Sequence, residues 1–171
     1  MVVALGAFVG IDRAVLDLIQ MPHTSWLDLA ASVVTLCGQT EVVGTVALAI
    51  AIVRLRNRRR DWWVPLLVAV VVGLEIVFKL VVPQSPPPSE LARSVPLLPF
   101  LEGPTTFSFP SGHVARVAFL VAALRWPASV SAVVVLVMAI TRVYLAEHWP
   151  SDVLGGWLLG YGVAALARFR T

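Results

Sequence analysis

The chain has 171 residues, of which 58% are hydrophobic and only 13% are charged. Soluble domains have about 25% charged residues, so this composition excludes an ordinary soluble globular protein and indicates an integral membrane protein of about four to six spans. The net charge of +3 does not indicate nucleic-acid binding, because the arginines are concentrated in one short stretch without interleaved aromatic residues. The single cysteine, Cys37, excludes an internal disulfide.

The N-terminal residues are predicted to form short helices that do not cross the membrane on their own. Residues 2–10 are apolar but too short for a span, so we interpret them as a truncated span or a surface helix. In residues 11–19 the apolar positions share one helical face, which is typical of a helix that lies in the membrane interface. These positions are Ile11, Val15, Leu18 and Ile19. Ser25 can cap a further helix over residues 26–36, which is too short to cross and is re-entrant or interfacial.

Residues 38–171 are predicted to form a bundle of about five transmembrane helices. The expected helices cover residues 40–53, 62–82, 111–124, 129–145 and 151–167. Five arginines follow the first of them at residues 54–60, which places this loop in the cytoplasm by the positive-inside rule. The proline-rich stretch 83–109 is then a long loop on the outer side. The chain is therefore expected to be a single all-α membrane domain, with interfacial or re-entrant helices in residues 1–37.

This topology brings three groups of polar residues to the outer face. Lys79 lies near the end of its helix, the turn 110–113 precedes the next helix, and residues 142–152 join the last two helices. Ionisable residues are rare within membrane segments and mark functional sites there. The sequence therefore predicts one polar site at the outer membrane face.

The sequence Pro110-Ser111-Gly112-His113 is typical of a helix N-terminus that binds an anion. Ser111 suits the N-cap position, and Gly112 lets the backbone amides approach a phosphate with the positive end of the helix dipole behind them. The alternative interpretation is a serine-capped helix start that binds no ligand.

A second histidine, His148, precedes Asp152 by one helical turn, with Pro150 between them. A carboxylate bonded to one ring nitrogen fixes the imidazole tautomer and leaves the other nitrogen to attack. The alternative for Asp152 is a favourable charge in the first turn of a helix that starts at Pro150. Lys79 follows Glu75 by one helical turn, so an ion pair is also expected there.

These residues resemble the signatures of the type 2 phosphatidic acid phosphatase superfamily of membrane lipid phosphatases. The signature Pro-Ser-Gly-His matches completely at residues 110–113. A further signature matches at Arg142, His148 and Asp152, with Thr141 in the place of a serine. The resemblance covers residues 25–171 and implies a membrane-embedded phosphatase domain.

The first signature of this family, a lysine followed after six residues by Arg-Pro, is incomplete. Lys79 and Pro87 are present, but Pro86 stands in the place of the arginine. Arg116, one turn beyond the first histidine, and Arg93 in the outer loop are candidate substitutes for the missing guanidinium. The alternatives are an interhelical tether for Arg116 and a solvated loop charge for Arg93.

The resemblance implies hydrolysis of a phosphomonoester or diphosphate through a phosphohistidine intermediate, without a metal or other cofactor. His148 would be the nucleophile, Asp152 its orienting partner and His113 the acid that protonates the leaving oxygen. The groups that would hold the phosphoryl oxygens are Lys79, Arg142 and the backbone of Ser111 and Gly112. For Arg142 the alternative is a side chain that extends to the membrane interface.

The implied partners are a lipid phosphate substrate and the surrounding membrane lipids, with the site on the extracytoplasmic face of the cell membrane. Undecaprenyl diphosphate is the expected substrate, and phosphatidate and phosphatidylglycerophosphate are competing candidates, because their tails can all stay in the bilayer. One alternative is a catalytically weakened member that binds or translocates lipid phosphates, which predicts binding without turnover. The other is a purely structural membrane protein.

Overall fold

The computed structural model describes residues 8–97 and 107–168, and the regular structure within these residues is helical. The predicted all-α class is confirmed. The predicted apolar helix at residues 2–10 lies mostly outside the described residues. The α-helices are α2 (Val9–Gln20), α3 (Ser25–Thr35), α4 (Thr40–Arg56), α5 (Val68–Val81), α6 (Gly112–Ala123), α7 (Ala128–Tyr144) and α8 (Pro150–Arg168). Short 3₁₀ turns, η1 (Leu36–Gly38), η2 (Val64–Leu67) and η3 (Ser89–Leu91), lie between them.

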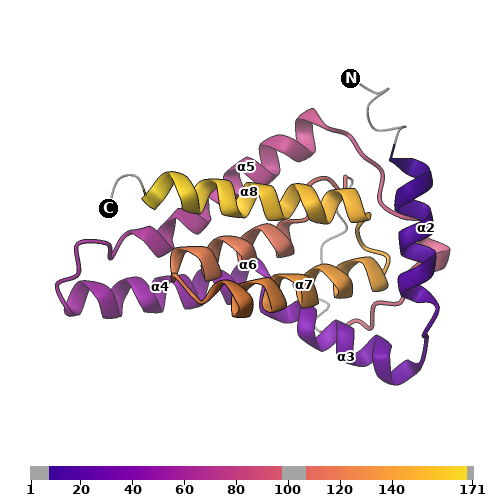
Figure 1. Ribbon diagram of the computed structural model, residues 1–171, viewed down its shortest axis with the longest axis horizontal. Helices are drawn as coiled ribbons and strands as arrows, with labels where there is room; N and C mark the ends of the chain where they lie inside the picture. Colours follow the sequence, from indigo (N-terminus) through magenta and orange to yellow (C-terminus); the bar gives the residue numbers. More distant parts are fainter. Residues whose placement is uncertain (1–7, 98–106, 169–171) are drawn as a thin grey trace.

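Helices α4 to α8 run roughly along the long axis of the molecule, and α2 and α3 lie at one end of it (Figure 1). The C-terminal ends of α5 and α7 and the N-terminal ends of α4, α6 and α8 face this end, whereas the arginine-rich turn after α4 lies at the other. Helix α6 is central, with ten of its 12 residues buried. The three groups of polar residues that were predicted to meet therefore lie at one end of the bundle.

Local sequence explains where the helices begin. The helix predicted over residues 62–82 starts as the 3₁₀ turn η2, with Pro65 in its first turn, where the missing amide hydrogen costs no helical hydrogen bond. Helix α4 is longer than predicted, because it continues into the arginine-rich stretch and arginine favours helix. The N-cap of α3 is Thr24 and not Ser25, so that prediction was wrong: the Thr24 hydroxyl accepts the N–H of Leu27 at 3.3 Å.

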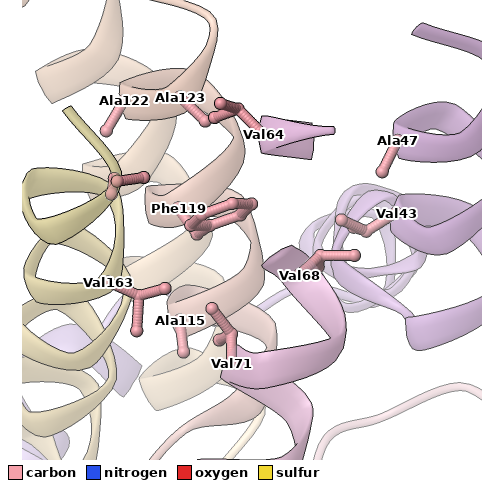
Figure 2. Close-up of a cluster of buried hydrophobic side chains, with 12 residues drawn as sticks. Val43, Ala47, Val64, Val68, Val71, Ala115, Phe119, Ala122, Ala123 and Val163 are labelled. Atoms are coloured by element: carbon pink, nitrogen blue, oxygen red, sulfur yellow. The ribbon is translucent and has the colours of Figure 1, made fainter. Parts of the chain in front are cut away.

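The main apolar core surrounds Phe119 of α6 (Figure 2). Its ring is fully buried among small side chains from α4, α5 and α8. In a membrane, lipid is as apolar as these side chains, so close van der Waals packing and not the exclusion of water holds such helices together. The other labelled core residues are Val43, Ala47, Val64, Val68, Val71, Ala115, Ala122, Ala123 and Val163.

Glycines let α8 lie directly against α6. A methyl group at Gly156 would overlap the carbonyl oxygen of Ser111, and one at Gly160 would overlap the carbonyl oxygen of Ala115. The two glycines share one face of α8 and form the small-residue stripe that is typical of closely packed membrane helices. This contact places the start of α8, with Asp152, beside the start of α6.

Gly160→Ala is expected to destabilise the protein, because the added methyl group must displace the Ala115 backbone. We expect a loss of about 1–3 kcal/mol, the usual cost of overpacking. The matched control is Gly162→Ala on the same helix, where a methyl group would meet no atom within 4 Å and alanine favours the helix by about 1 kcal/mol. Thermal unfolding in detergent measures both variants, and equal midpoints would contradict the packing argument.

The helical segment Val64–Val81 is long and apolar enough to cross a membrane by itself. The segments Ser25–Gly38 and Thr40–Arg56 pass the same test together, as a pair bent by 45° at its break, and α6 and α7 are shorter apolar helices. This count rests on the described residues alone, so the predicted number of about five spans stays a prediction. The composition and the many exposed valines and leucines on α5 and α7 support a membrane protein.

The helix predicted over residues 11–19 is present as α2, but only part of its apolar face contacts the bundle: Val15 and Ile19 are half-buried. Ile11 and Leu18, which belong to the predicted apolar face, are 61% and 60% exposed. The residues of α2 that are buried are Asp12, Leu16 and Gln20. The contact between α2 and the rest of the protein therefore combines two polar side chains with Leu16 and Ile19.

Candidate active site

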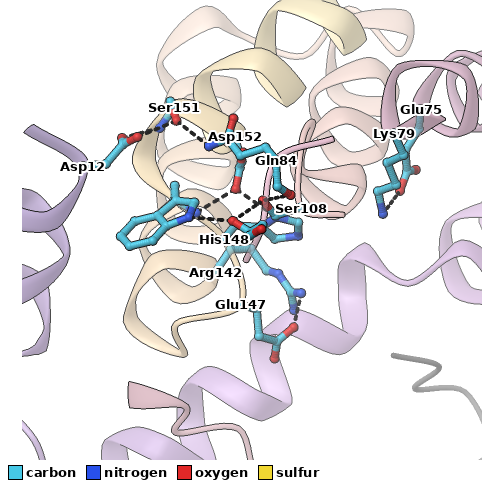
Figure 3. A network of polar contacts seen from close by, with 12 residues as sticks. Asp12, Glu75, Lys79, Gln84, Ser108, Arg142, Glu147, His148, Ser151 and Asp152 are labelled. Carbon is cyan, nitrogen blue, oxygen red and sulfur yellow. Dashed lines mark hydrogen bonds and ion pairs between the residues drawn. The ribbon is translucent and has the colours of Figure 1, made fainter. Parts of the chain in front are cut away.

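The predicted site residues of α5, α6, α7 and α8 lie at one end of the bundle, and Figure 3 shows His148 and Asp152 near Arg142, with Lys79 and Glu75 farther away. The backbone N–H of Ser111 donates to the carbonyl oxygen of Asp152 at 2.9 Å, which joins the two histidine-bearing segments directly. Arg116 lies 3.5 Å from His113 and pairs with Glu75, which also pairs with Lys79, so the first group is joined to the second. The predicted convergence of the three groups is therefore seen in the described residues.

His148 and Asp152 form the pair that their spacing predicted. His148 lies in the turn between α7 and α8 and Asp152 in the first turn of α8, and both side chains are buried. The His148 Nδ1 atom is 3.6 Å from Asp152 Oδ2, an ion-pair distance that is too long for a hydrogen bond. The same oxygen accepts the backbone N–H of Trp149 at 2.8 Å. Asp152 thus satisfies an amide at the helix start, as one interpretation predicted, and faces the histidine at ion-pair distance, while its role as the orienting partner stays a prediction.

Burial lowers the pKa of His148 below its ordinary value. The Asp152 carboxylate acts in the opposite direction, and the positive charge of Arg142 acts in the same direction as burial. The ring is therefore neutral at neutral pH, with a lone pair available on one nitrogen. A neutral, oriented imidazole is the state that a nucleophile requires.

Arg142 is buried in the last turn of α7, where its guanidinium has protein partners. Its Nη1 atom donates to the Thr35 hydroxyl at 2.5 Å, and its Nη2 atom pairs with the carboxylate of Glu147. The sequence analysis missed both partners. Glu147 stands directly before His148, which is a signal that could have been used, whereas nothing in the sequence connects Thr35 with this site.

Glu75 links the first group of polar residues to the second. Its carboxylate pairs with Lys79 at 3.1 Å, as the spacing predicted, and with Nη1 of Arg116 at 2.6 Å. Arg116 is buried and also donates from Nε to the carbonyl oxygen of Gly38 at 3.0 Å. It therefore acts as an interhelical tether, the alternative considered above. Its Nη2 atom lies 3.5 Å from Nδ1 of His113, which keeps it beside the predicted acid.

Ser111 occupies the N-cap position of α6, as predicted, but its hydroxyl makes no cap hydrogen bond. Among the described residues the buried Ser111 Oγ has no hydrogen-bond partner, and the first N–H groups of any helix lack partners within the helix. Gly112 lets the Glu75 carboxylate lie directly against the start of α6. Any side chain at position 112 would overlap that carboxylate. Binding of a phosphate at the start of α6 stays a prediction.

Pro86 stands in the place of the family arginine. The residues just before it form hydrogen bonds with the segments that contain the other two signatures. The carbonyl oxygen of Gln84 accepts the Ser108 N–H at 2.8 Å, and that of Ser85 accepts the Trp149 indole N–H at 2.9 Å. Arg93 lies farther along the same loop, with its guanidinium 5.9 Å from the centre of the Tyr144 ring. The role of Arg93 as a substitute stays a prediction.

Metal ligands were also sought. Within residues 8–97 and 107–168, no group of three or more histidine, cysteine, aspartate or glutamate side chains is arranged to hold a metal ion. We therefore assign no metal ligand to any residue of the site.

Proteins of known structure or function that are similar to this chain come from several organisms. A solved structure with a similar fold is the transmembrane PAP2 type phosphatidylglycerolphosphate phosphatase from Bacillus subtilis, with a TM-score of 0.75 over 96% of this chain and 86% of that one, at 22% sequence identity. At this identity the likeness shows the fold alone.

Two curated proteins are similar in sequence to part of this chain. The chain is 35% identical over 69 residues to an undecaprenyl-diphosphatase from Sulfolobus acidocaldarius, which is 37% of this chain and 34% of that protein. It is 42% identical over 66 residues to the putative undecaprenyl-diphosphatase YbjG from Escherichia coli, which is 36% of this chain and 33% of that protein. The match thus spans about a third of the length of each relative. The model of the PAP2 superfamily matches residues 60–169, more than half of the sequence, and the chain therefore belongs to the PAP2 superfamily.

Proposed function

We propose that this protein is a lipid phosphate phosphatase, a single membrane-embedded domain that hydrolyses a phosphomonoester or diphosphate through a phosphohistidine intermediate. The observation that supports this most directly is the pairing of buried His148 with Asp152 beside His113 and Arg142. Buried ionisable groups are costly in a membrane protein and are kept where they function. Membership of the PAP2 superfamily supports the same reaction class.

His148 is the proposed nucleophile. Its Nδ1 atom faces Asp152, so the other ring nitrogen, Nε2, attacks the phosphorus atom. A bond forms between Nε2 and phosphorus while the bond between phosphorus and the leaving oxygen breaks. The Asp152 carboxylate stabilises the positive charge that develops on the ring. A water molecule then attacks the phosphohistidine, which releases inorganic phosphate and restores the neutral imidazole.

His113 is the proposed acid. Nη2 of Arg116 lies 3.5 Å from Nδ1 of His113, so the other ring nitrogen, Nε2, is the one proposed to face the substrate. The ring acts as the imidazolium ion: Nε2 gives its proton to the leaving oxygen in the first step, which leaves the neutral ring. In the second step the same nitrogen takes a proton from the attacking water, which restores the imidazolium ion. Arg116 positions the ring in this scheme without contacting the substrate.

Arg142, Lys79 and the amides at the start of α6 are proposed to hold the phosphoryl oxygens. Charge spreads over these oxygens in the transition state, and prearranged donors stabilise it there. The unpartnered hydroxyl of Ser111 adds a further donor at the same helix start. Glu147 and Glu75 neutralise the two basic side chains until the phosphate arrives.

Undecaprenyl diphosphate is the favoured substrate, because both curated relatives are named as diphosphatases of this lipid. Phosphatidate and phosphatidylglycerophosphate are the competing candidates. The site lies at the opposite end of the bundle from the arginine-rich turn, which supports a site on the extracytoplasmic face and a multi-pass topology. From that face a lipid head group reaches the histidines while its tail stays in the bilayer.

The test is phosphate release by the purified protein in detergent from each of these three lipids, with and without a chelator. We expect release from at least one lipid and an unchanged rate with the chelator. Failure to release phosphate from any of them would overturn the proposed function. If the protein binds a lipid phosphate but releases no phosphate from it, it is instead a catalytically weakened family member. Pro86 in the place of the signature arginine is the feature that motivates this alternative.

A further inference from the structure

Helix α2 buries two polar side chains, Asp12 and Gln20, against the rest of the protein. Its buried positions, Asp12, Leu16 and Gln20, follow one another at intervals of four residues, while Ile11 and Leu18 point outward. A buried carboxylate or amide costs free energy unless hydrogen bonds satisfy it. The partners of Asp12 and Gln20 therefore show what this helix is built to contact.

Asp12 binds the start of α8. Its Oδ1 atom accepts the backbone N–H of Ser151 at 2.9 Å, and its Oδ2 atom accepts the Ser151 hydroxyl at 2.7 Å, across 139 residues of sequence (Figure 3). The residue before α8, Trp149, has no side-chain oxygen to cap the helix. Asp12 supplies this cap from another helix, and its negative charge suits the helix N-terminus. Ser151 directly precedes Asp152.

Gln20 binds the end of α7. Its Nε2 atom donates to the carbonyl oxygen of Tyr144 at 2.7 Å and to that of Leu91 at 3.0 Å. Tyr144 is the last residue of α7, where carbonyl groups lack partners within the helix. Between these two polar contacts, Leu16 is fully buried against Val143 and Ala146.

The two polar contacts fall on either side of the turn that bears His148. We infer that α2 is a clamp on this turn, in which Asp12 and Gln20 act as positioning residues that hold His148 in register with Asp152 for the proposed reaction. The inference rests on the proposed function for its catalytic consequence. It concerns residues outside the part of the chain that matches the family model, residues 60–169.

Asp12→Ala tests the clamp by two readouts. Hydrogen exchange of the amides in residues 144–153 reports the holding of the turn without any turnover, and we expect it to become faster. Phosphate release reports the consequence, and we expect kcat to fall by about tenfold to a hundredfold with KM changed less than about twofold, as for a misplaced reacting group. Asp12→Asn keeps one acceptor oxygen for the Ser151 N–H, so it should retain more activity than alanine.

The matched control is Asp17→Asn on the same helix, where Asp17 is exposed and pairs with Arg13, one helical turn away. It should leave the exchange rates and kcat at wild-type values. Gln20→Met, which keeps the side-chain length and removes the amide, tests the other end of the clamp and should act in the same direction as Asp12→Ala. Size-exclusion profiles identify any variant that does not fold.

Unchanged exchange in residues 144–153 for both Asp12→Ala and Gln20→Met would overturn the inference, and so would an equal loss of kcat in Asp17→Asn. If exchange becomes faster in these variants while kcat stays at the wild-type value, α2 holds the turn but the position of the turn does not matter for the reaction. That result also overturns the positioning role. If the wild type releases no phosphate while exchange still responds to Asp12→Ala, the proposed function fails and the clamp on the turn stands.

Discussion

Alanine in place of His148 is expected to abolish phosphate release, with a loss of at least about 10⁴-fold in kcat. The proposed reaction passes through a bond between this ring and phosphorus, and no other described side chain combines a ring nitrogen with a carboxylate placed as Asp152 is. His113 cannot replace it, because its Nδ1 atom faces Arg116. Substrate should still bind, since Arg142 and Lys79 remain.

The measurement is a single-turnover reaction with a lipid labelled in its terminal phosphate, stopped in alkali, where phosphohistidine is stable. Wild-type protein should acquire the label and His148→Ala should not. The control is His23→Ala, because His23 is exposed in the turn between α2 and α3. Turnover by the His148 variant, or label retained on it, would contradict the assigned nucleophile.

Asp152→Asn is expected to lower kcat by about 10²–10⁴-fold while the fold is retained. The asparagine has the same shape in a fully buried position, but it cannot stabilise a positive charge on His148. Its amide must also either offer its oxygen to the Trp149 N–H or leave that group without an acceptor. Either orientation disturbs the ring, so the loss should appear in kcat far more than in KM.

The pH dependence of kcat/KM provides a second measurement on this variant. Attack requires neutral His148, so the rate falls as the pH drops through the pKa of this ring. Burial lowers that pKa and Asp152 acts to raise it. Removing the carboxylate charge should therefore lower the pKa further and move the acidic limb to lower pH, on a reduced plateau.

A suitable control for Asp152→Asn is Asp61→Asn, because Asp61 pairs with Arg54 and Arg59 at the opposite end of the bundle. It makes the same chemical change and should leave kcat and the pH profile unaltered. An acidic limb that moves to higher pH in Asp152→Asn would show that the carboxylate does not stabilise the charged ring.

Short-range spacing predicted the parts of the site that lie within one helix or turn. Lys79 and Glu75 form the expected ion pair because one helical turn separates them. The same geometry places Asp152 beside His148 once a helix starts at Pro150. These predictions needed only the local helix and no knowledge of the neighbouring helices.

Contacts between distant parts of the chain could not be predicted in this way. Arg142 and Thr35 are 107 residues apart, and Arg116 and Glu75 are 41 residues apart. Each pair exists because packed helices bring the two side chains together, and no local pattern marks one threonine or glutamate for this purpose. The unpartnered hydroxyl of Ser111 likewise depends on its surroundings, although its N-cap position was predicted.

The sequence by itself determined the helical class, the resemblance to the family and the two histidines, because composition and short spacings are local properties of a chain. Only the tertiary structure decided the partners of Arg142 and the orientation of α2. An amphipathic pattern shows that a helix has two faces, but the environment decides which face is buried. Lipid accepts apolar side chains, so the polar stripe of α2 lies where hydrogen bonds are available, against the turn that bears His148.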